Sequence, residues 1–130
     1  MSKIEPIENM IICGDCVSSL RQQLEAHNGE PFADLVFADP PFNIGFEYDK
    51  YQDKLSCEHY LDWSREWMAV CRDILTEQGS FWIAIGDEYA AELKIILKEL
   101  GMNFRNWIIW YYTFGQNTKK KFSRSHAHIL

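Results

Sequence analysis

An aspartate, two prolines and a phenylalanine stand in a row at residues 39–42, directly after an apolar run at residues 34–38. Proline fixes φ and has no backbone N–H, so Asp39-Pro40-Pro41 predicts a stiff turn whose carbonyl oxygens meet no competing donor. The ionised Asp39 carboxylate is a further acceptor, and Phe42 adds a flat apolar face. Rigid acceptors beside such a face suit an exocyclic amino group on a heteroaromatic ring.

An amine of this kind is a poor nucleophile because its lone pair is delocalised into the ring. The turn would hold one N–H on the Asp39 side chain and the other on the Pro40 carbonyl, with the ring stacked on Phe42. Holding both hydrogens in a tetrahedral arrangement turns the lone pair toward an electrophile. Catalysis would then rest on positioning and preorganised electrostatics, and it would need no metal and no covalent intermediate.

The elements that must position this turn alternate between strand and helix patterns. Apolar runs predict strands over 9–13, 34–38, 80–86 and 103–114 and the start of another at 126–130, and helical spacing predicts helices over 16–27, 58–76 and 88–100. We expect Ser56 to cap the second helix and Gly79 to end it, and Gly101 to end the third. The aromatic side chains of the fourth strand are expected to pack in the core or at the sheet edge.

This alternation indicates a Rossmann-like α/β domain with a parallel, doubly wound sheet, in which the run at 34–38 would be buried on both faces. Ligands of such sheets bind at the carboxyl ends of the strands. Asp15, Asp39 and the Gly86-Asp87 pair each follow a predicted strand directly, so we expect them on one rim. A helix-capping role is the alternative for Asp15 and Asp87.

Length and composition indicate one domain with a substantial core: the chain has 130 residues, of which 47% are hydrophobic and 15% aromatic. No apolar run of about eighteen residues is present, and the first residues have no signal-peptide core. A cytoplasmic protein without a membrane segment is therefore expected.

Four cysteines raise the question of metal or redox chemistry. Cys13 and Cys16 form a CxxC pair, but a zinc site needs a second pair of similar spacing, which Cys57 and Cys71 do not supply. We expect reduced structural thiols and no metal.

The charge is distributed unevenly. The net charge is −6, yet residues 1–118 contain all nineteen acidic residues and only nine of the thirteen Lys and Arg residues. The segment 119–124, with sequence KKKFSR, has four positive charges and no negative one. A basic patch beside an aromatic residue favours a local phosphate contact, and a solvated basic loop is the alternative.

Asp39-Pro40-Pro41-Phe42 resembles the catalytic motif of the amino-methyltransferases that modify DNA at adenine N6 or cytosine N4, and an aspartate in first place resembles the adenine version. The segments at 12–16, 60–89 and 110–130 are similar to further blocks of this family. The resemblance implies S-adenosylmethionine as cofactor and double-stranded DNA as partner, with the target base flipped out of the duplex.

The resemblance also implies roles for individual residues. It assigns Asp15, Cys16 and Asp39 to the cofactor and Phe122 to the enclosure of the flipped base. The remaining residues assigned to DNA are Lys119, Lys120, Lys121 and Arg124. His126 receives no catalytic role, because the glutamate that follows the histidine in many relatives is Ala127 here.

The glycine-rich cofactor loop of this family has no counterpart in the sequence. Residues 1–130 are therefore expected to form the catalytic half of the methyltransferase domain, an incomplete fold without the recognition region. Open apolar sheet edges favour pairing, so we expect self-association or pairing with the missing half.

Several functions stay open beside adenine-N6 methylation. Cytosine-N4 methylation uses the same kind of amine, and protein-glutamine methylation uses a similar turn, although those enzymes resemble an Asn-Pro-Pro-Tyr pattern. From a different class, the chain could be an inactive half-domain that acts as a binding or assembly module, or a degenerate remnant.

Overall fold

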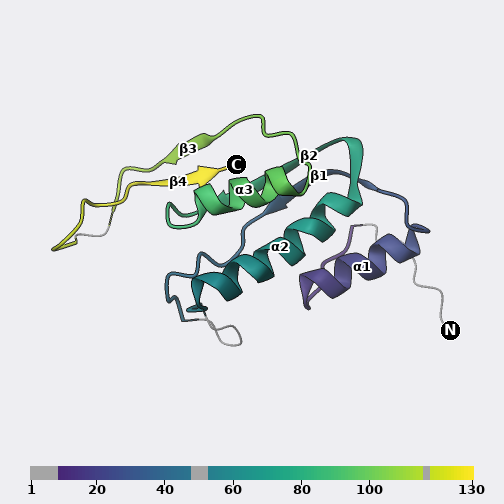
Figure 1. Ribbon diagram of the computed structural model, residues 1–130, viewed down its shortest axis with the longest axis horizontal. Coiled ribbons are helices and arrows are strands. Elements are labelled where there is room, and N and C mark those ends of the chain that lie inside the picture. The colour runs from purple at the N-terminus through teal and green to yellow at the C-terminus, as the bar shows by residue number, and fades with distance from the viewer. Residues whose placement is uncertain (1–8, 48–52, 116–117) are drawn as a thin grey trace.

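The structure is a computed structural model that describes residues 9–47, 53–115 and 118–130. Helices and strands alternate through most of the chain (Figure 1). In chain order the elements are α1 (Cys16–Ala26), β1 (Ala33–Ala38), α2 (Cys57–Ile74), β2 (Leu75–Ile85), α3 (Ala90–Glu99), β3 (Ile108–Tyr111) and β4 (His126–Ile129). Within the described residues, no helix is long and apolar enough to cross a membrane.

The strands form one sheet in the order β1-β2-β4-β3. β1 and β2 are parallel, as expected, but β4 is antiparallel to both β2 and β3. The expectation of an entirely parallel sheet is therefore wrong. A parallel connection needs a crossover, usually a helix, and no helix lies between β3 and β4 among the described residues. The chain instead returns as a long hairpin (Figure 1).

The helices lie on the same side of the sheet, where α1 packs against α2, and α2 packs against β2 and α3. Phe81, Ile83 and Ile85 of β2 alternate toward them and meet residues of α1, α2 and α3 in a single cluster. On the opposite face Leu35, Phe37 and Trp82 are 60%, 55% and 37% exposed. The run at 34–38 is thus covered on one face only. The Rossmann-like α/β class is confirmed as a partial fold, whose second helical layer is not formed by the described residues.

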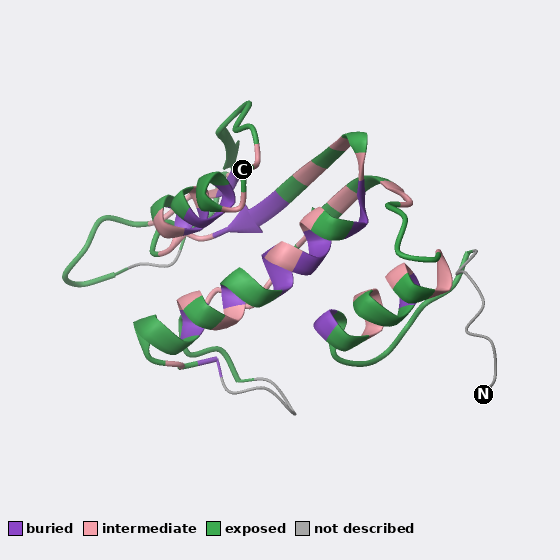
Figure 2. Ribbon diagram, turned by 45° about the vertical axis from the view of Figure 1, so that its right-hand side comes forward, coloured by how far each residue is buried: buried purple, intermediate pink, exposed green. Residues whose placement is uncertain are grey.

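Two expected strands differ from the structure. Residues 9–13 form no strand, and Ile11 is 97% exposed. A strand is stabilised only by pairing with a neighbour, and this segment leads into α1 without a strand partner in the described part of the chain. The fourth strand is limited to residues 108–111. Trp110 and Tyr111 are 58% and 67% exposed on this edge strand, so they lie at the sheet edge, one of the two expected positions, and not in the core. The whole strand is exposed (Figure 2).

The helices agree more closely than the strands with the predictions made from the sequence. Asp15 and Ser56 cap α1 and α2, where their side chains accept hydrogen bonds from the backbone N–H groups of Ser18 and His59. Gly101 has a φ of +81° just after α3. Gly79, however, does not end α2. The helix ends at Ile74, and the chain enters β2 at the next residue, Leu75.

Gly79 lies in β2 where the β1–β2 register shifts. A Cβ atom there would lie 2.9 Å from Leu75 Cδ2 and 3.0 Å from the carbonyl oxygens of Ala33 and Thr76. Glycine is required at this position because the backbone approaches its neighbour closely, which is typical of a bulge.

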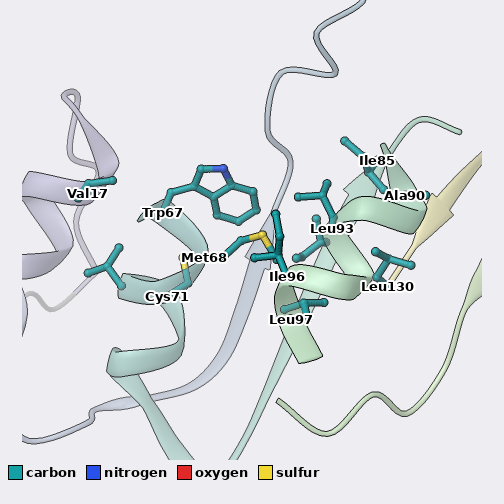
Figure 3. Packing of buried hydrophobic residues seen from close by; sticks show 12 residues of the cluster. Val17, Trp67, Met68, Cys71, Ile85, Ala90, Leu93, Ile96, Leu97 and Leu130 are labelled. Carbon is teal, nitrogen blue, oxygen red and sulfur yellow. The ribbon is translucent and has the colours of Figure 1, made fainter. Parts of the chain in front are cut away.

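The core lies between the helices and β2 (Figure 3). Met68 of α2, Ile83 and Ile85 of β2 and Leu93 of α3 are completely buried. Cys71 belongs to the same cluster, and burial raises the pKa of its thiol to about 12. Cys13, Cys16 and Cys57 are exposed free thiols.

Candidate active site

The turn at residues 39–42 follows the carboxyl end of β1, and a side chain of α2 holds it in place. Asp39 is exposed, whereas Pro40, Pro41 and Phe42 are half-buried. Tyr60, in the first turn of α2, is completely buried, and its hydroxyl donates to the Pro41 carbonyl oxygen at 2.7 Å. The bond to Tyr60 is made by Pro41 and not by Pro40, whose carbonyl is the expected acceptor for an amine.

The Phe42 ring lies against the backbone of Gly86, at the carboxyl end of β2. A Cβ atom at Gly86 would lie 3.2 Å from Phe42 Cδ2, so a side chain here would push the ring away. The structure thus brings the 39–42 turn and Gly86 to the same rim of two parallel strands, as expected. The ring is supported on one side and remains partly exposed.

Asp15 and Cys16 lie elsewhere. Cys16 is close enough to Cys71 to contribute to the raised pKa of that thiol, which puts the start of α1 beside the C-terminal half of α2. The 39–42 turn contacts Tyr60, eleven residues earlier in α2, or about 16 Å along the helix axis. The segment at 9–13, which was expected to lead Asp15 to the rim, is not a strand. The hydrogen bond from the Ser18 N–H to Asp15 lowers the pKa of that carboxyl.

A buried carboxylate beneath the turn was not found by sequence reasoning. Asp53 is only 3% exposed, and its two carboxylate oxygens accept the backbone N–H groups of Asn43, Ile44 and Phe46 at 2.8, 3.1 and 2.9 Å. The Gly45 N–H donates to the Asp53 carbonyl oxygen at 2.6 Å. This cradle fixes the backbone directly after Phe42.

Asn43 joins the same loop to the segments that lead into α2 and α3. Its φ is +57°, a region where asparagine is enriched, and its side chain is buried. The side-chain oxygen accepts the Leu55 N–H at 2.7 Å, and the side-chain nitrogen donates to the Leu55 carbonyl at 2.9 Å and to the Tyr89 hydroxyl at 3.1 Å. The sequence signal was a weak one, an Asn-x-Gly turn pattern at residues 43–45.

The basic segment extends from the body of the protein in the hairpin between β3 and β4 (Figure 1). Lys119, Lys120 and Lys121 are exposed, and Phe122 is 98% exposed. Arg124 differs from them because its guanidinium contacts Asp87 at 3.2 Å and Glu88 at 3.0 Å. The hydrogen bond to Glu88 and both carboxylate charges raise the pKa of Arg124. Its charge is compensated, and it ties the hairpin to the rim.

Comparisons with known proteins give a family match and several similar proteins. Residues 33–130 match the DNA methylase family N6_N4_Mtase. The chain is 34% identical over 125 residues to the type II methyltransferase M.HpaI of Haemophilus parainfluenzae, covering 95% of this chain and 38% of the relative. It is 31% identical over 121 residues to the DNA adenine methyltransferase YhdJ of Escherichia coli K12, covering 92% of this chain and 39% of the relative.

A solved structure shares the fold. The crystal structure of the M1.HpyAVI–SAM complex superposes with a TM-score of 0.60 at 14% sequence identity, over 88% of this chain and 50% of that one. The chain thus spans about two fifths of the length of the two curated relatives and half of this structural neighbour.

Proposed function

The chain belongs to the N6/N4 DNA methylase family, and from this premise we propose that residues 1–130 are the catalytic half of an S-adenosylmethionine-dependent DNA methyltransferase that acts on adenine N6. The observation that carries the proposal is the turn at residues 39–42. It offers an exposed carboxylate at Asp39 and a ring at Phe42, which is backed by Gly86 at the carboxyl end of the next strand.

In this proposal the chain binds and orients the target amine. A base flipped out of the duplex would donate its two N–H groups to the Asp39 carboxylate and the Pro40 carbonyl, and its ring would stack on Phe42. The Tyr60 hydroxyl is engaged at Pro41, so it does not compete for the Pro40 oxygen. S-adenosylmethionine supplies an activated methyl group when it is bound.

The described residues fit one side of such a cofactor site. Asp39 is an exposed acceptor beside the amine position and suits a positively charged amino group. Asp15 and Cys16 also belong to the proposed cofactor site, but they lie beside the other end of α2. We infer that a complementary segment supplies the remaining cofactor contacts, because the chain spans 38% of M.HpaI and 39% of YhdJ.

Adenine is favoured over cytosine by the aspartate in first place of the turn and by the similarity to a relative named as an adenine methyltransferase. The test is transfer of labelled methyl from S-adenosylmethionine to duplex DNA of mixed sequence, followed by separation of the nucleosides. N6-methyladenine supports the proposal. N4-methylcytosine as the product would replace it with the cytosine alternative.

The uncovered sheet face favours association of this half-domain, either with a complementary segment or with a second copy of the chain. Leu35, Phe37 and Trp82 are exposed on neighbouring strands, and a contiguous apolar surface of this kind is typical of an interaction site. We expect sedimentation velocity at micromolar concentration to show self-association that a Phe37→Glu substitution weakens. A clean monomer at these concentrations would contradict the expectation.

The basic hairpin is the proposed DNA contact, through Lys119, Lys120, Lys121 and Phe122, with Arg124 as its anchor. In a titration of DNA affinity against salt, Lys120→Gln should reduce the slope of log K against log[salt] by about 0.9, the value for one phosphate contact. Arg124→Gln should leave the slope unchanged, because Asp87 and Glu88 already compensate that charge. An equal loss of slope in both variants would assign Arg124 to a phosphate as well.

A further inference from the structure

We propose that Asn43 and Asp53 are positioning residues, which set the geometry of the amine-binding turn through the backbone directly after Phe42. This inference rests on the proposed function, because it assigns roles at the same site. Neither side chain is expected to touch the base or the cofactor: both are buried, at 8% and 3% exposure.

The Asp53 carboxylate stabilises the backbone that follows Phe42. The Ile44 and Phe46 residues are 56% and 62% exposed. Their N–H groups nevertheless both donate to Asp53 Oδ2, while the Asn43 N–H donates to Oδ1. Hydrogen bonds to an ionised acceptor are shorter and stronger than neutral ones. One buried carboxylate therefore holds the backbone N–H groups of Asn43, Ile44 and Phe46, and the Asp53 carbonyl oxygen holds that of Gly45.

Asn43 connects this loop to the support of the turn. Its side-chain nitrogen donates to the Tyr89 hydroxyl at 3.1 Å, and the Tyr89 ring lies 4.5 Å from the Tyr60 ring. Tyr60 in turn donates to the Pro41 carbonyl at 2.7 Å. The turn is thus held at Pro41 by Tyr60 and directly after Phe42 by Asn43, and both of these residues contact Tyr89.

This arrangement explains how Asp39 and Phe42 keep one relative orientation although the prolines do not restrict the backbone after residue 41. The prolines restrict φ only at residues 40 and 41, and Phe42 has no such restriction. The left-handed φ of Asn43, +57°, ends the turn at one defined place. Loss of this geometry should reduce turnover by about 100-fold, since displacements near 1 Å have effects of that size.

Two variants separate the bonds from the backbone conformation. Asp53→Asn keeps the shape but replaces one acceptor oxygen with an NH₂ group, which would face a backbone N–H in either orientation of the amide. Asn43→Gly keeps the left-handed φ and removes the side-chain bonds. The matched controls are Asp34→Asn and Asn28→Gly, at exposed positions away from the turn, and Asn28 has a φ of +58°.

The first measurement is amide hydrogen exchange by NMR on the 130-residue chain, which needs no activity. The Ile44 and Phe46 amides should be protected in the unsubstituted chain and in Asp34→Asn, and should exchange faster on the order of tenfold in Asp53→Asn, which loses acceptor bonds. The Phe42 ring resonances should shift in Asp53→Asn and Asn43→Gly only. Unprotected amides in the unsubstituted chain, or unmoved Phe42 resonances, would overturn the proposal.

The second measurement is steady-state methyl transfer. We expect kcat to fall by about 100-fold in Asp53→Asn, with KM for S-adenosylmethionine unchanged and with folding retained at the assay temperature. An unchanged kcat together with lost amide protection would show that Asn43 and Asp53 only stabilise the loop. A chain without transfer activity would show that the complementary segment is required for transfer, and the exchange and Phe42 resonances would still decide the positioning role.

Discussion

An Asp39→Ala chain is expected to lose methyl transfer by about 10²–10³-fold or more while keeping its fold. Removal of one preorganised hydrogen-bonding group from a reaction centre has effects of this size, and Asp39 is proposed both to hold the amine and to contact the cofactor. Its side chain is exposed at the end of β1 and is not part of the buried cluster. The measurement is the initial rate of labelled methyl transfer, beside the thermal unfolding curve of the same preparation.

The matched control is Asp34→Ala, an exposed aspartate at the other end of the same strand. Asp34 accepts a hydrogen bond from the Thr76 hydroxyl at 3.0 Å and is remote from the turn, so its substitution should leave the rate unchanged. Asp39→Asn adds a finer distinction, since it keeps one acceptor oxygen and removes the charge. Full activity of Asp39→Ala would be incompatible with a mechanism in which this carboxylate holds the amine.

A Leu93→Ala substitution is expected to have the largest effect on stability. Leu93 is completely buried in α3, where it belongs to the cluster that joins the helices to β2 (Figure 3). Truncation of a buried leucine lowers the free energy of unfolding by about 2–5 kcal/mol, against a total of about 5–15 kcal/mol for a typical domain. Urea denaturation should give a lower midpoint with an unchanged slope.

Ile95 provides the control within the same helix. Its side chain is 56% exposed, so Ile95→Ala should change the free energy of unfolding by no more than about 0.5 kcal/mol. Equal midpoints for the Leu93 and Ile95 variants would mean that α3 does not pack on the sheet as described. Because α3 also presents Tyr89 to Asn43 just before its first turn, loss of its packing should reduce transfer activity as well.

The turn at residues 39–42 could be predicted because its determinants are local. Asp39, Pro40, Pro41 and Phe42 are consecutive, and the two prolines alone predict a stiff turn after the apolar run of β1. The residues that support the turn could not be predicted from the sequence. Asp53 is ten residues from Asn43, and Tyr89 is 46 residues away, and nothing in the types of these residues indicates that they meet.

For the basic segment, too, only part of the description could be predicted from the sequence. Its four positive charges predicted a phosphate contact, but sequence reasoning could not distinguish Arg124 from the lysines. Arg124 meets Asp87 and Glu88 only because β4 pairs with β2 and returns the hairpin to the rim. Whether a cation is compensated or available to a ligand depends on which acidic residues the fold brings to it.

By itself, the sequence determined the helices, the N-caps of α1 and α2, and the turn at residues 39–42. Helical hydrogen bonds join residues four apart, and a capping side chain reaches a donor three residues away, as Asp15 and Ser56 do. Only the tertiary structure decided that residues 9–13 form no strand, that β4 is antiparallel and that one sheet face is open. A strand has no hydrogen-bond partner within itself, so its existence, direction and burial depend on distant segments of the chain.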